Sequence, residues 1–343
     1  MTHTAKAWWA KNWFPVMIFV AVGMGLLFPR VGEPAGIWKP GSFVTVAVFV
    51  IFYLQGMVLP VKELARGILL WRFHATVLLF NFVLAPALAW LLFASPWSPV
   101  EAHSVHGFLY LAILPTTVSS AVALTVASRG DSAAALFGVT LSNLVGIVMV
   151  PFGVVFWMRA GGEQVNMSFV EALLRVGKLI ALPMAFGQIT RIILPRGVDW
   201  VKRKVGMLSQ MLIVGIVWIL FAESAAKGEW GQFSAMLLVW TCVGVVIYFV
   251  LFSALFWGVS ARIGLQPGER IAAYFCGTEK GLATGAPMAT AFFLTASESG
   301  HLPPMGMILL PLMLYHPLQL TVGSFLAARF HQKAVEADQE SIS

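Results

Sequence analysis

The feature that most constrains this chain is a succession of long apolar segments. Ten such runs, bounded by charged residues or by clusters of Pro and Gly, fall at residues 13–29, 42–59, 74–94, 105–128, 132–157, 170–194, 207–225, 232–259, 268–294 and 304–328. A helix that crosses a bilayer needs about 17 to 25 mostly apolar residues, and each run is long enough. The sequence therefore predicts an all-α membrane protein with ten transmembrane helices.

Composition agrees with a protein whose partner is the lipid bilayer. Of the 343 residues, 59% are hydrophobic and 11% are charged, whereas soluble domains carry about 25% charged residues. We expect a single transmembrane domain over residues 1–343. The net charge of +7 is scattered along the chain, which argues against a nucleic-acid surface. The sequence has no metalloprotease, nucleophile-elbow, phosphate-loop or dinucleotide motif, so we expect neither an enzyme nor an organic cofactor.

The distribution of Lys and Arg orients the helices, because cytoplasmic loops hold most of these residues. With a cytoplasmic N-terminus, fifteen of the 22 basic residues lie on the cytoplasmic side, four lie outside, and three lie within apolar runs. The four outer residues are Arg30, Lys39, Arg159 and Lys227, and the three inner ones are Arg175, Lys178 and Lys280. We therefore expect a multi-pass protein of a bacterial inner membrane with both termini in the cytoplasm.

Ten helices divide into two halves of five, and an odd number per half turns the second half upside down. We expect inverted repeats over residues 13–157 and 170–328, an architecture of secondary transporters, followed by a cytoplasmic tail at 329–343. The fourth run of each half is interrupted by polar and helix-breaking residues: Leu114–Asp131 reads LPTTVSSAVALTVASRGD, and Cys276–Pro287 reads CGTEKGLATGAP. Because lipid excludes irregular backbone, both interruptions should face protein or a water-lined cavity.

The interruptions supply the polar side chains of a candidate binding site, which are Thr116, Thr117, Ser119, Ser120 and Thr278. A plainer interpretation is that hydroxyls such as those of Ser119, Ser120 and Thr278 bond back to the preceding helical turn, and that the nearby glycines allow close helix packing.

Glu279 and Lys280 are harder to explain by packing, since intramembrane charges are costly and are usually functional. We expect the two to act as a coupled unit in which each compensates the charge of the other.

Five segments carry a family pattern: FYLQGMVLP (Phe52–Pro60), FNFVLAPALAW (Phe80–Trp90), the fourth run through Asp131, CGTEKGLATGAP, and LPLMLYHPLQL (Leu310–Leu320). They resemble the bile acid:sodium symporter superfamily, most closely its SBF-like branch, which includes the solute carrier family 10 member 7 type and bacterial homologues. The resemblance implies a core domain of the third to fifth and eighth to tenth helices, in which the two broken helices cross. A panel domain of the other four helices would complete the fold, with substrate between the domains.

The resemblance also implies ligands for Na⁺ as a coupling ion at the crossover. Asn81 and Ser120 fall at ligand positions of the symporters, and Thr140 lies near another. The expected sodium site is near Asn81, Ser120 and Glu279.

Other ligand positions of the symporters are replaced. Ala121 stands where they have an asparagine, and Tyr274 stands where they have a key glutamate. We therefore expect sodium dependence to be weak or absent, with Lys280 supplying the positive charge that sodium supplies in the relatives.

Further candidates lie on neighbouring runs. Arg175 and Lys178 share a helical face with Glu171 and would recruit an anionic substrate, or else extend to the outer interface and pair with Glu171. On the tenth run, His316 and Gln319 would contact the crossover, although a lone histidine often serves only packing. Asn143 on the fifth run would contact the crossover or a neighbouring helix.

These features predict a secondary active transporter that moves a small organic anion by alternating access, coupled to Na⁺ or H⁺. One alternative is a cation/proton exchanger in which Glu279 and Lys280 handle the ion. Another is a membrane sensor or regulator that keeps the fold without flux. The identity of the solute, symport or antiport, and the formation of a homo-oligomer stay open.

The topology generates a direct prediction. Reporters fused at the N-terminus, near Lys202 and at the C-terminus should report the cytoplasm, and reporters near Glu101 or Glu298 should report the outside. An external reporter near Lys202 would overturn both the ten-helix topology and the inverted repeat.

Overall fold

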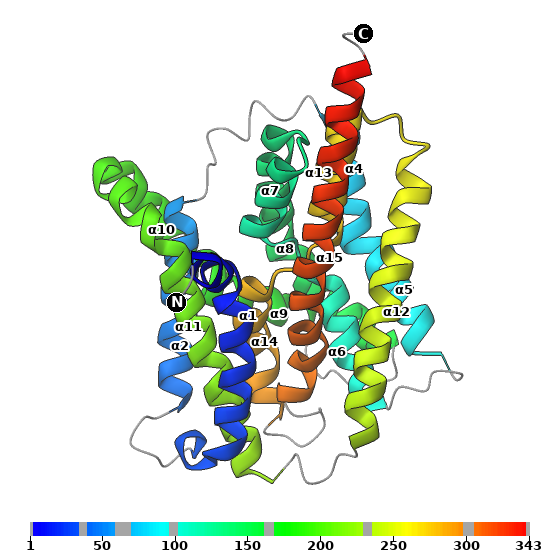
Figure 1. The fold of residues 1–343 in the computed structure, drawn as a ribbon. Coiled ribbons are helices and arrows are strands. Elements are labelled where there is room, and N and C mark those ends of the chain that lie inside the picture. Colours follow the sequence, from blue (N-terminus) through cyan, green and yellow to red (C-terminus); the bar gives the residue numbers. More distant parts are fainter. Residues whose placement is uncertain are drawn as a thin grey trace. The chain divides into compact units, whose positions relative to one another are not determined.

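The computed structural model describes residues 3–33, 40–58, 70–95, 102–160, 168–228, 235–297 and 305–340 (Figure 1). Over these residues the regular structure is helical, and β-pairing is limited to one isolated bridge between Thr116 and Lys280. The expected all-α class is therefore confirmed.

Every expected apolar run contains helix. The first part of the chain forms α1 (His3–Leu27), η1 (Pro29–Gly32), α2 (Pro40–Val58), α4 (Trp71–Leu79), η2 (Phe80–Leu84), α5 (Ala85–Phe93), α6 (Ala102–Ile113), α7 (Val118–Ala127) and α8 (Ser132–Ala160). The second part forms α9 (Phe169–Val176), η3 (Gly177–Ala181), α10 (Leu182–Ile193), α11 (Pro195–Ala226), α12 (Ala235–Ser260), α13 (Pro267–Thr278), α14 (Leu282–Ser297) and α15 (Met305–Glu340). The η2 and η3 segments are π-helical turns within longer helices.

Several helices have the length and composition to cross a membrane. Among the described residues, six such segments are Gly41–Val58, Trp71–Phe93, Ser132–Phe156, Lys204–Ala226, Met236–Ser260 and Met305–Glu336. Trp13–Leu27, Ser104–Ile113 and Val118–Ala127 are shorter apolar helices. These segments indicate an integral multi-pass membrane protein, whereas the count of ten spans and the inverted repeat stay predictions.

Two boundaries differ from the sequence-based expectation. The stretch around Lys202, expected as a loop, belongs to α11, which begins at Pro195 directly after α10. Proline suits the first helical position because the N–H that it lacks would have no intrahelical partner there. Residues 329–340, expected as a separate tail, continue α15 as helix, in keeping with the Ala, Arg, Lys, Gln and Glu that they contain.

Internal contacts divide the chain into two compact units. The first unit comprises residues 1–59, 174–237 and 285–309, and the second comprises residues 60–173, 238–284 and 310–343. The first unit thus includes α1, α2, α10 and α11, and the second includes α4 to α8, α13 and most of α12 and α15. The division into core and panel domains stays a prediction.

Glycine allows very close helix packing in the first unit, where α2 lies against α10. A Cβ atom on Gly56 would lie 2.2 Å from the carbonyl oxygen of Met184, and one on Gly187 would lie 2.2 Å from that of Tyr53. The side-chain amide of Gln188 donates to the carbonyl oxygen of Gly56 across the same contact. The two backbones therefore touch at a point where no larger residue fits.

In the second unit, aromatic side chains pack α12 against the helical residues 74–93. The ring of Phe80 lies 4.7 Å from that of Phe256 and 6.0 Å from that of Phe252, measured between centroids. Tyr248 stacks on Phe252, and its hydroxyl donates to the carbonyl oxygen of Ala85 at 3.2 Å. This layer of buried rings packs against η2, the turn that carries Asn81.

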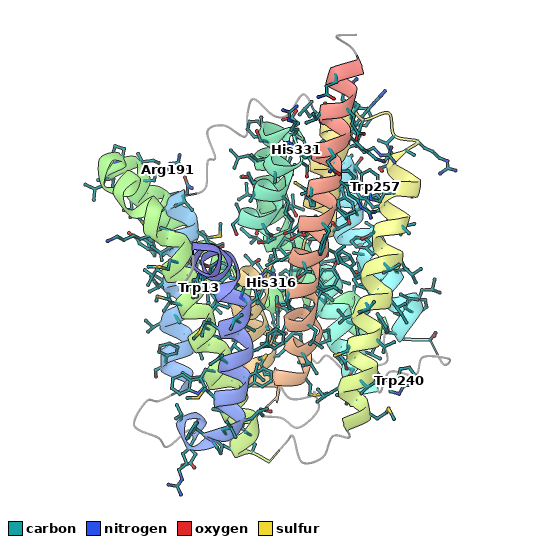
Figure 2. The ribbon with its side chains drawn as sticks, viewed as in Figure 1. Trp13, Arg191, Trp240, Trp257, His316 and His331 are labelled. Carbon is teal, nitrogen blue, oxygen red and sulfur yellow. The ribbon has the colours of Figure 1, made fainter. Side chains whose placement is uncertain are left out.

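The start of α13 is fixed to the end of α12. The guanidinium of Arg270 lies 4.8 Å from the ring centroid of Trp257, which Figure 2 labels on α12. It also donates to the hydroxyl of Ser260 at 3.0 Å and to the carbonyl oxygen of Trp257 at 2.9 Å. A capping box between Gln266 and Glu269 begins α13.

Gly187→Ala should lower the stability of the first unit, because its Cβ atom would meet the backbone of α2. Overpacking of this kind costs about 1–3 kcal/mol. Gly23→Ala is the matched control, since a Cβ atom on Gly23 of α1 has no heavy atom within 4 Å. Thermal unfolding in detergent should show a lower midpoint for Gly187→Ala alone, and equal midpoints for both variants would contradict this packing.

Candidate functional site

The first interruption lies between α6 and α7. Helix α6 ends at Ile113 and α7 begins at Val118, so residues 114–117 are not helical. Pro115 accounts for the break, because proline has no N–H for a helical hydrogen bond and disfavours helical conformation at the preceding residue. The interior of one apolar run therefore contains both a helix C-terminus and a helix N-terminus.

The second interruption lies between α13 and α14. Glu279 follows the last residue of α13 in an extended conformation, with φ −77° and ψ 112°. At Gly281, a Cβ atom would lie 2.5 Å from the hydroxyl oxygen of Thr284 and 3.4 Å from the carbonyl oxygen of Pro115. Glycine at position 281 thus leaves room for the hydroxyl of Thr284, and both predicted interruptions are present.

The two interruptions cross and pair through their backbones. The N–H of Thr117 donates to the carbonyl oxygen of Glu279 at 3.2 Å, and the N–H of Gly281 donates to that of Pro115 at 3.1 Å. Between these bonds, Thr116 and Lys280 form the antiparallel bridge. The pairing satisfies backbone groups that the four helix ends leave without intrahelical partners. We call this arrangement, residues 114–117 with 279–281, the crossover.

Side chains of α8 and α15 form hydrogen bonds with the peptide groups of Thr116 and Lys280, at the centre of the crossover. On α15, Gln319 accepts a hydrogen bond from the N–H of Lys280 at 2.7 Å and donates to its carbonyl oxygen at 2.9 Å. On α8, Ser142 accepts from the N–H of Thr116 at 3.4 Å, and Asn143 donates to the carbonyl oxygen of Thr116 at 2.9 Å. Both strands of the bridge are therefore fixed in the same manner.

The ammonium of Lys280 is enclosed and fully hydrogen-bonded. Its Nζ atom donates to Oδ1 of Asn81 at 3.0 Å and to the carbonyl oxygens of Ala112 and Leu114, each at 2.9 Å. The two carbonyls lie at the C-terminal end of α6, where the helix dipole is negative. Lys280 is 0% exposed, so its charge is stabilised by oriented dipoles in place of water.

Asn81 receives this ammonium because it lies in the π-helical turn η2. Its Nδ2 atom donates to the carbonyl oxygen of Cys276 at 2.9 Å and to the hydroxyl of Ser142 at 3.2 Å. The amide thus connects α13, α8 and Lys280. Such π-helical turns are frequent at functional sites, where they reorient a side chain.

Glu279 points to a different neighbour. Its Oε2 atom accepts a hydrogen bond from the hydroxyl of Ser120, in the first turn of α7, at 2.9 Å. Its Oε1 atom lies 3.2 Å from where a Cβ atom on Gly323 of α15 would be. Glycine at position 323 therefore leaves room for the carboxylate, which is 2% exposed.

The action of Glu279 and Lys280 as a coupled unit stays a prediction, and the two charges do not form an ion pair within 4.0 Å. The reason is local geometry. Successive side chains in extended backbone point to opposite sides, so the carboxylate reaches Ser120 and the ammonium reaches Asn81.

Three other predicted residues have clear positions. The hydroxyl of Thr278 donates to the carbonyl oxygen of Tyr274 at 2.7 Å, and that of Thr140 donates to the carbonyl oxygen of Leu136 at 2.7 Å, so both bond back to the preceding turn. Figure 2 labels His316 on α15, where its Nδ1 atom lies 3.0 Å from Nε2 of Gln319. His316 therefore meets the crossover through Gln319.

The side chains of the remaining predicted residues differ in their surroundings. Ser119 is exposed, whereas the hydroxyl of Thr116 is buried and has no hydrogen-bond partner in the described structure. Lys178 is exposed on η3, and the side chain of Arg175 lies outside the described residues. Glu171 accepts a hydrogen bond from the N–H of Ser168 at 2.8 Å at the start of α9.

Sequence reasoning missed three residues that the structure places at the crossover. Tyr315 donates from its hydroxyl to the carbonyl oxygen of Thr278 at 2.8 Å, and Ser142 and Gly323 make the contacts described above. Tyr315 and Ser142 each stand next to a residue that was chosen, His316 and Asn143 respectively, which was the only available signal.

Both of the replaced symporter positions, Ala121 and Tyr274, are buried. Tyr274 stacks on Trp257 with 5.1 Å between centroids, packs near Phe330, and shares a hydrogen bond of 3.1 Å with the hydroxyl of Ser253. Neither position offers a carboxylate or amide oxygen to a cation.

Helices of membrane-spanning length and a buried crossover of two interrupted helices define a multi-pass membrane protein of the transporter type. The sequence profile of the SBF-like CPA transporter family matches residues 12–332. The chain belongs to this family and is a membrane transporter.

Relatives from animals and bacteria match over nearly their full lengths. "Sodium/bile acid cotransporter 7" of Mus musculus is 30% identical over 323 residues, which cover 92% of this chain and 91% of the relative. "Putative symporter YfeH" of Escherichia coli (strain K12) is 31% identical over 340 residues, 96% of each chain. "Uncharacterized protein PA2026" of Pseudomonas aeruginosa is 28% identical over 326 residues, 94% of each chain.

Gln319→Leu should destabilise the second unit, because it leaves the N–H and the carbonyl group of Lys280 without their partners. An unsatisfied buried polar group costs about 1–3 kcal/mol, and two groups are affected. Gln332→Leu, at an exposed position of the same helix, is the matched control. Chemical denaturation of both variants should separate them, and a stable Gln319→Leu would show that the Gln319 contacts contribute little.

Proposed function

We propose that this protein is a secondary active transporter that moves a small organic anion by alternating access, coupled to Na⁺ or H⁺. The observation that carries the proposal is the crossover, in which two interrupted helices meet and bring buried charges together. Interrupted helices of this kind form the substrate and ion sites of secondary transporters. The family membership gives transport in general, and the buried charges of the crossover support the proposal that coupling occurs there.

The architecture that we propose is ten spans in two inverted repeats. Gln319 on α15 holds the peptide of Lys280 much as Ser142 and Asn143 on α8 hold the peptide of Thr116. In the proposed count of ten spans, α8 directly follows the interrupted run of α6 and α7. In the same way, α15 directly follows the interrupted run of α13 and α14. Equivalent contacts in equivalent positions are what an inverted repeat would produce, and this likeness supports the assignment.

An anionic cargo agrees with the electrostatics of the crossover. The helices α7 and α14 both begin there, and a helix N-terminus carries a partial positive charge. The ammonium of Lys280 adds a full positive charge nearby. We further propose that Arg175 and Lys178 recruit the anion, for which the exposed position of Lys178 is the available support.

We assign coupling to Glu279. Among the described side chains, Glu279 and Lys280 are the only buried members of the Asp, Glu, Lys and Arg group. Lys280 has three acceptors for its three protons, whereas Glu279 has a single hydroxyl donor from Ser120. A buried carboxylate with so little compensation is suited to take up and release a cation.

The burial of Glu279 and Lys280 at the crossover also favours a second candidate function, which is cation/proton exchange without an organic solute. Exchange would need only Glu279 and Lys280 at the crossover, and it would not need a binding space for a solute. Flux measurements separate the two functions, because only the first moves an organic acid. Absence of any flux would point to a sensor or regulator.

Proteoliposomes test the proposal with labelled taurocholate and a set of smaller labelled carboxylates. Uptake should occur for at least one of them under an inward gradient of Na⁺ or of H⁺, and the comparison of the two gradients identifies the coupling ion. Glu279→Gln should lower gradient-driven uptake by at least about tenfold, which corresponds to about 1.4 kcal/mol.

The matched control is Glu336→Gln, which removes an exposed carboxylate from α15 and should keep wild-type uptake. Wild-type uptake by Glu279→Gln would exclude Glu279 from coupling. Proton movement driven by a cation gradient, without uptake of any acid, would favour the exchanger.

A further inference from the structure

We infer that Lys280 fills a monovalent-cation site of the crossover with its own ammonium group, so that removal of the side chain leaves a site for a small alkylammonium ion. The inference adds to the proposed function the occupant of one ion position. It rests on that function only where it treats the crossover as the ion site of a transporter. It assigns a fixed occupant to one position of the crossover and leaves coupling to Glu279.

The number and type of contacts fit a tethered ammonium ion. A lysine ammonium has three N–H donors and no acceptor. Nζ of Lys280 has three oxygen acceptors at 2.9 to 3.0 Å, from Asn81, Ala112 and Leu114, and the carbonyl oxygen of Asn81 lies at 3.4 Å. All of these groups are neutral oxygens, which is the ligand set of a cation site.

Helix α6 supplies the negative potential. Its last carbonyl groups have no intrahelical partners, and two of them, on or next to the final turn, accept from Nζ. A cation at the C-terminus of a helix is stabilised by the helix dipole. The ring of Phe252, 5.9 Å from Nζ, adds a further weak attraction on another side.

The surroundings make a permanent occupant necessary. None of the described carboxylates lies within 4.0 Å of Nζ, and both Lys280 and Asn81 are 0% exposed. Without a cation, the carbonyl oxygens of Ala112 and Leu114 would be buried without donors, which is unfavourable. The chain meets this need covalently, and no ion has to bind or leave.

The residues do not fit a free sodium ion at the same place. The side-chain oxygen of Asn81 is bonded to Lys280, and the hydroxyls of Ser120 and Thr140 are bonded to Glu279 and to the carbonyl oxygen of Leu136. The ammonium of Lys280 therefore occupies the Asn81 oxygen that the resemblance assigned to sodium, and its charge repels a second cation there. A sodium ion should therefore not bind at the position of the Lys280 ammonium.

The test measures thermal unfolding of purified full-length protein in methylammonium, ammonium, sodium and choline chloride at equal ionic strength. A ligand that binds only the folded state raises the unfolding midpoint saturably. Wild-type protein should not respond to methylammonium beyond the choline control, because Lys280 already fills the site. Lys280→Ala should have a lower midpoint in choline, and methylammonium, which replaces the lost end of the side chain, should restore most of the loss.

Lys280→Met is the matched variant, because it removes the charge but keeps the volume. It should be destabilised and should not respond to methylammonium, since its side chain fills the space. If Lys280→Ala cannot be purified in choline, the yield of folded protein extracted in methylammonium is compared with that in choline, and a higher yield in methylammonium is expected.

Three results would overturn the inference. They are equal stabilisation of the wild-type protein and of Lys280→Ala by methylammonium, no response of Lys280→Ala to methylammonium by either readout, and rescue of Lys280→Ala by sodium alone. Because the readout is stability, the inference can fail while uptake in proteoliposomes still supports the transporter, and the reverse can also occur.

Discussion

The crossover depends on the contact between the ammonium of Lys280 and the open end of α6. Two helices are interrupted inside apolar runs, and each interruption leaves backbone groups that lipid cannot satisfy. The ammonium satisfies the carbonyls of Ala112 and Leu114, and the backbones of the two interruptions satisfy one another. These hydrogen bonds offset the free-energy cost of interrupting two helices inside apolar runs of the second unit.

Neighbouring elements are arranged around this contact. The π-helical turn η2 directs Asn81 to the ammonium, while Gln319 and the pair Ser142 and Asn143 fix the two peptides of the bridge. The N–H of Gly281 donates to the carbonyl oxygen of Pro115 and joins the two strands. With these groups rigidly held, Glu279 is the charged side chain of the crossover with the fewest bonds, and this contrast underlies its assignment to coupling.

Much of the fold could be predicted from the sequence, because length and hydrophobicity locate helices that cross a membrane and Pro115 and Gly281 mark the interruptions. Asn81, Asn143 and Gln319 all lie at the crossover; Asn81 was expected there from the resemblance, and the other two as polar side chains of the fifth and tenth runs. The action of Glu279 and Lys280 as a coupled unit stays a prediction, and the extended backbone at Glu279 turns the two side chains toward different partners. The roles of Tyr315 and Gly323 depend on which helices pack together, which a single sequence does not reveal.

The central claim is that Lys280 is a permanently bound ammonium ion at the crossover. Nitrogen-15 NMR of protein labelled at lysine, in proteoliposomes, tests it most directly, with the signal assigned by its loss in Lys280→Gln. We predict an ammonium signal with slow proton exchange that is the same in sodium chloride and in choline chloride. A neutral amine signal, or an ammonium signal that changes when sodium is added, would contradict the claim.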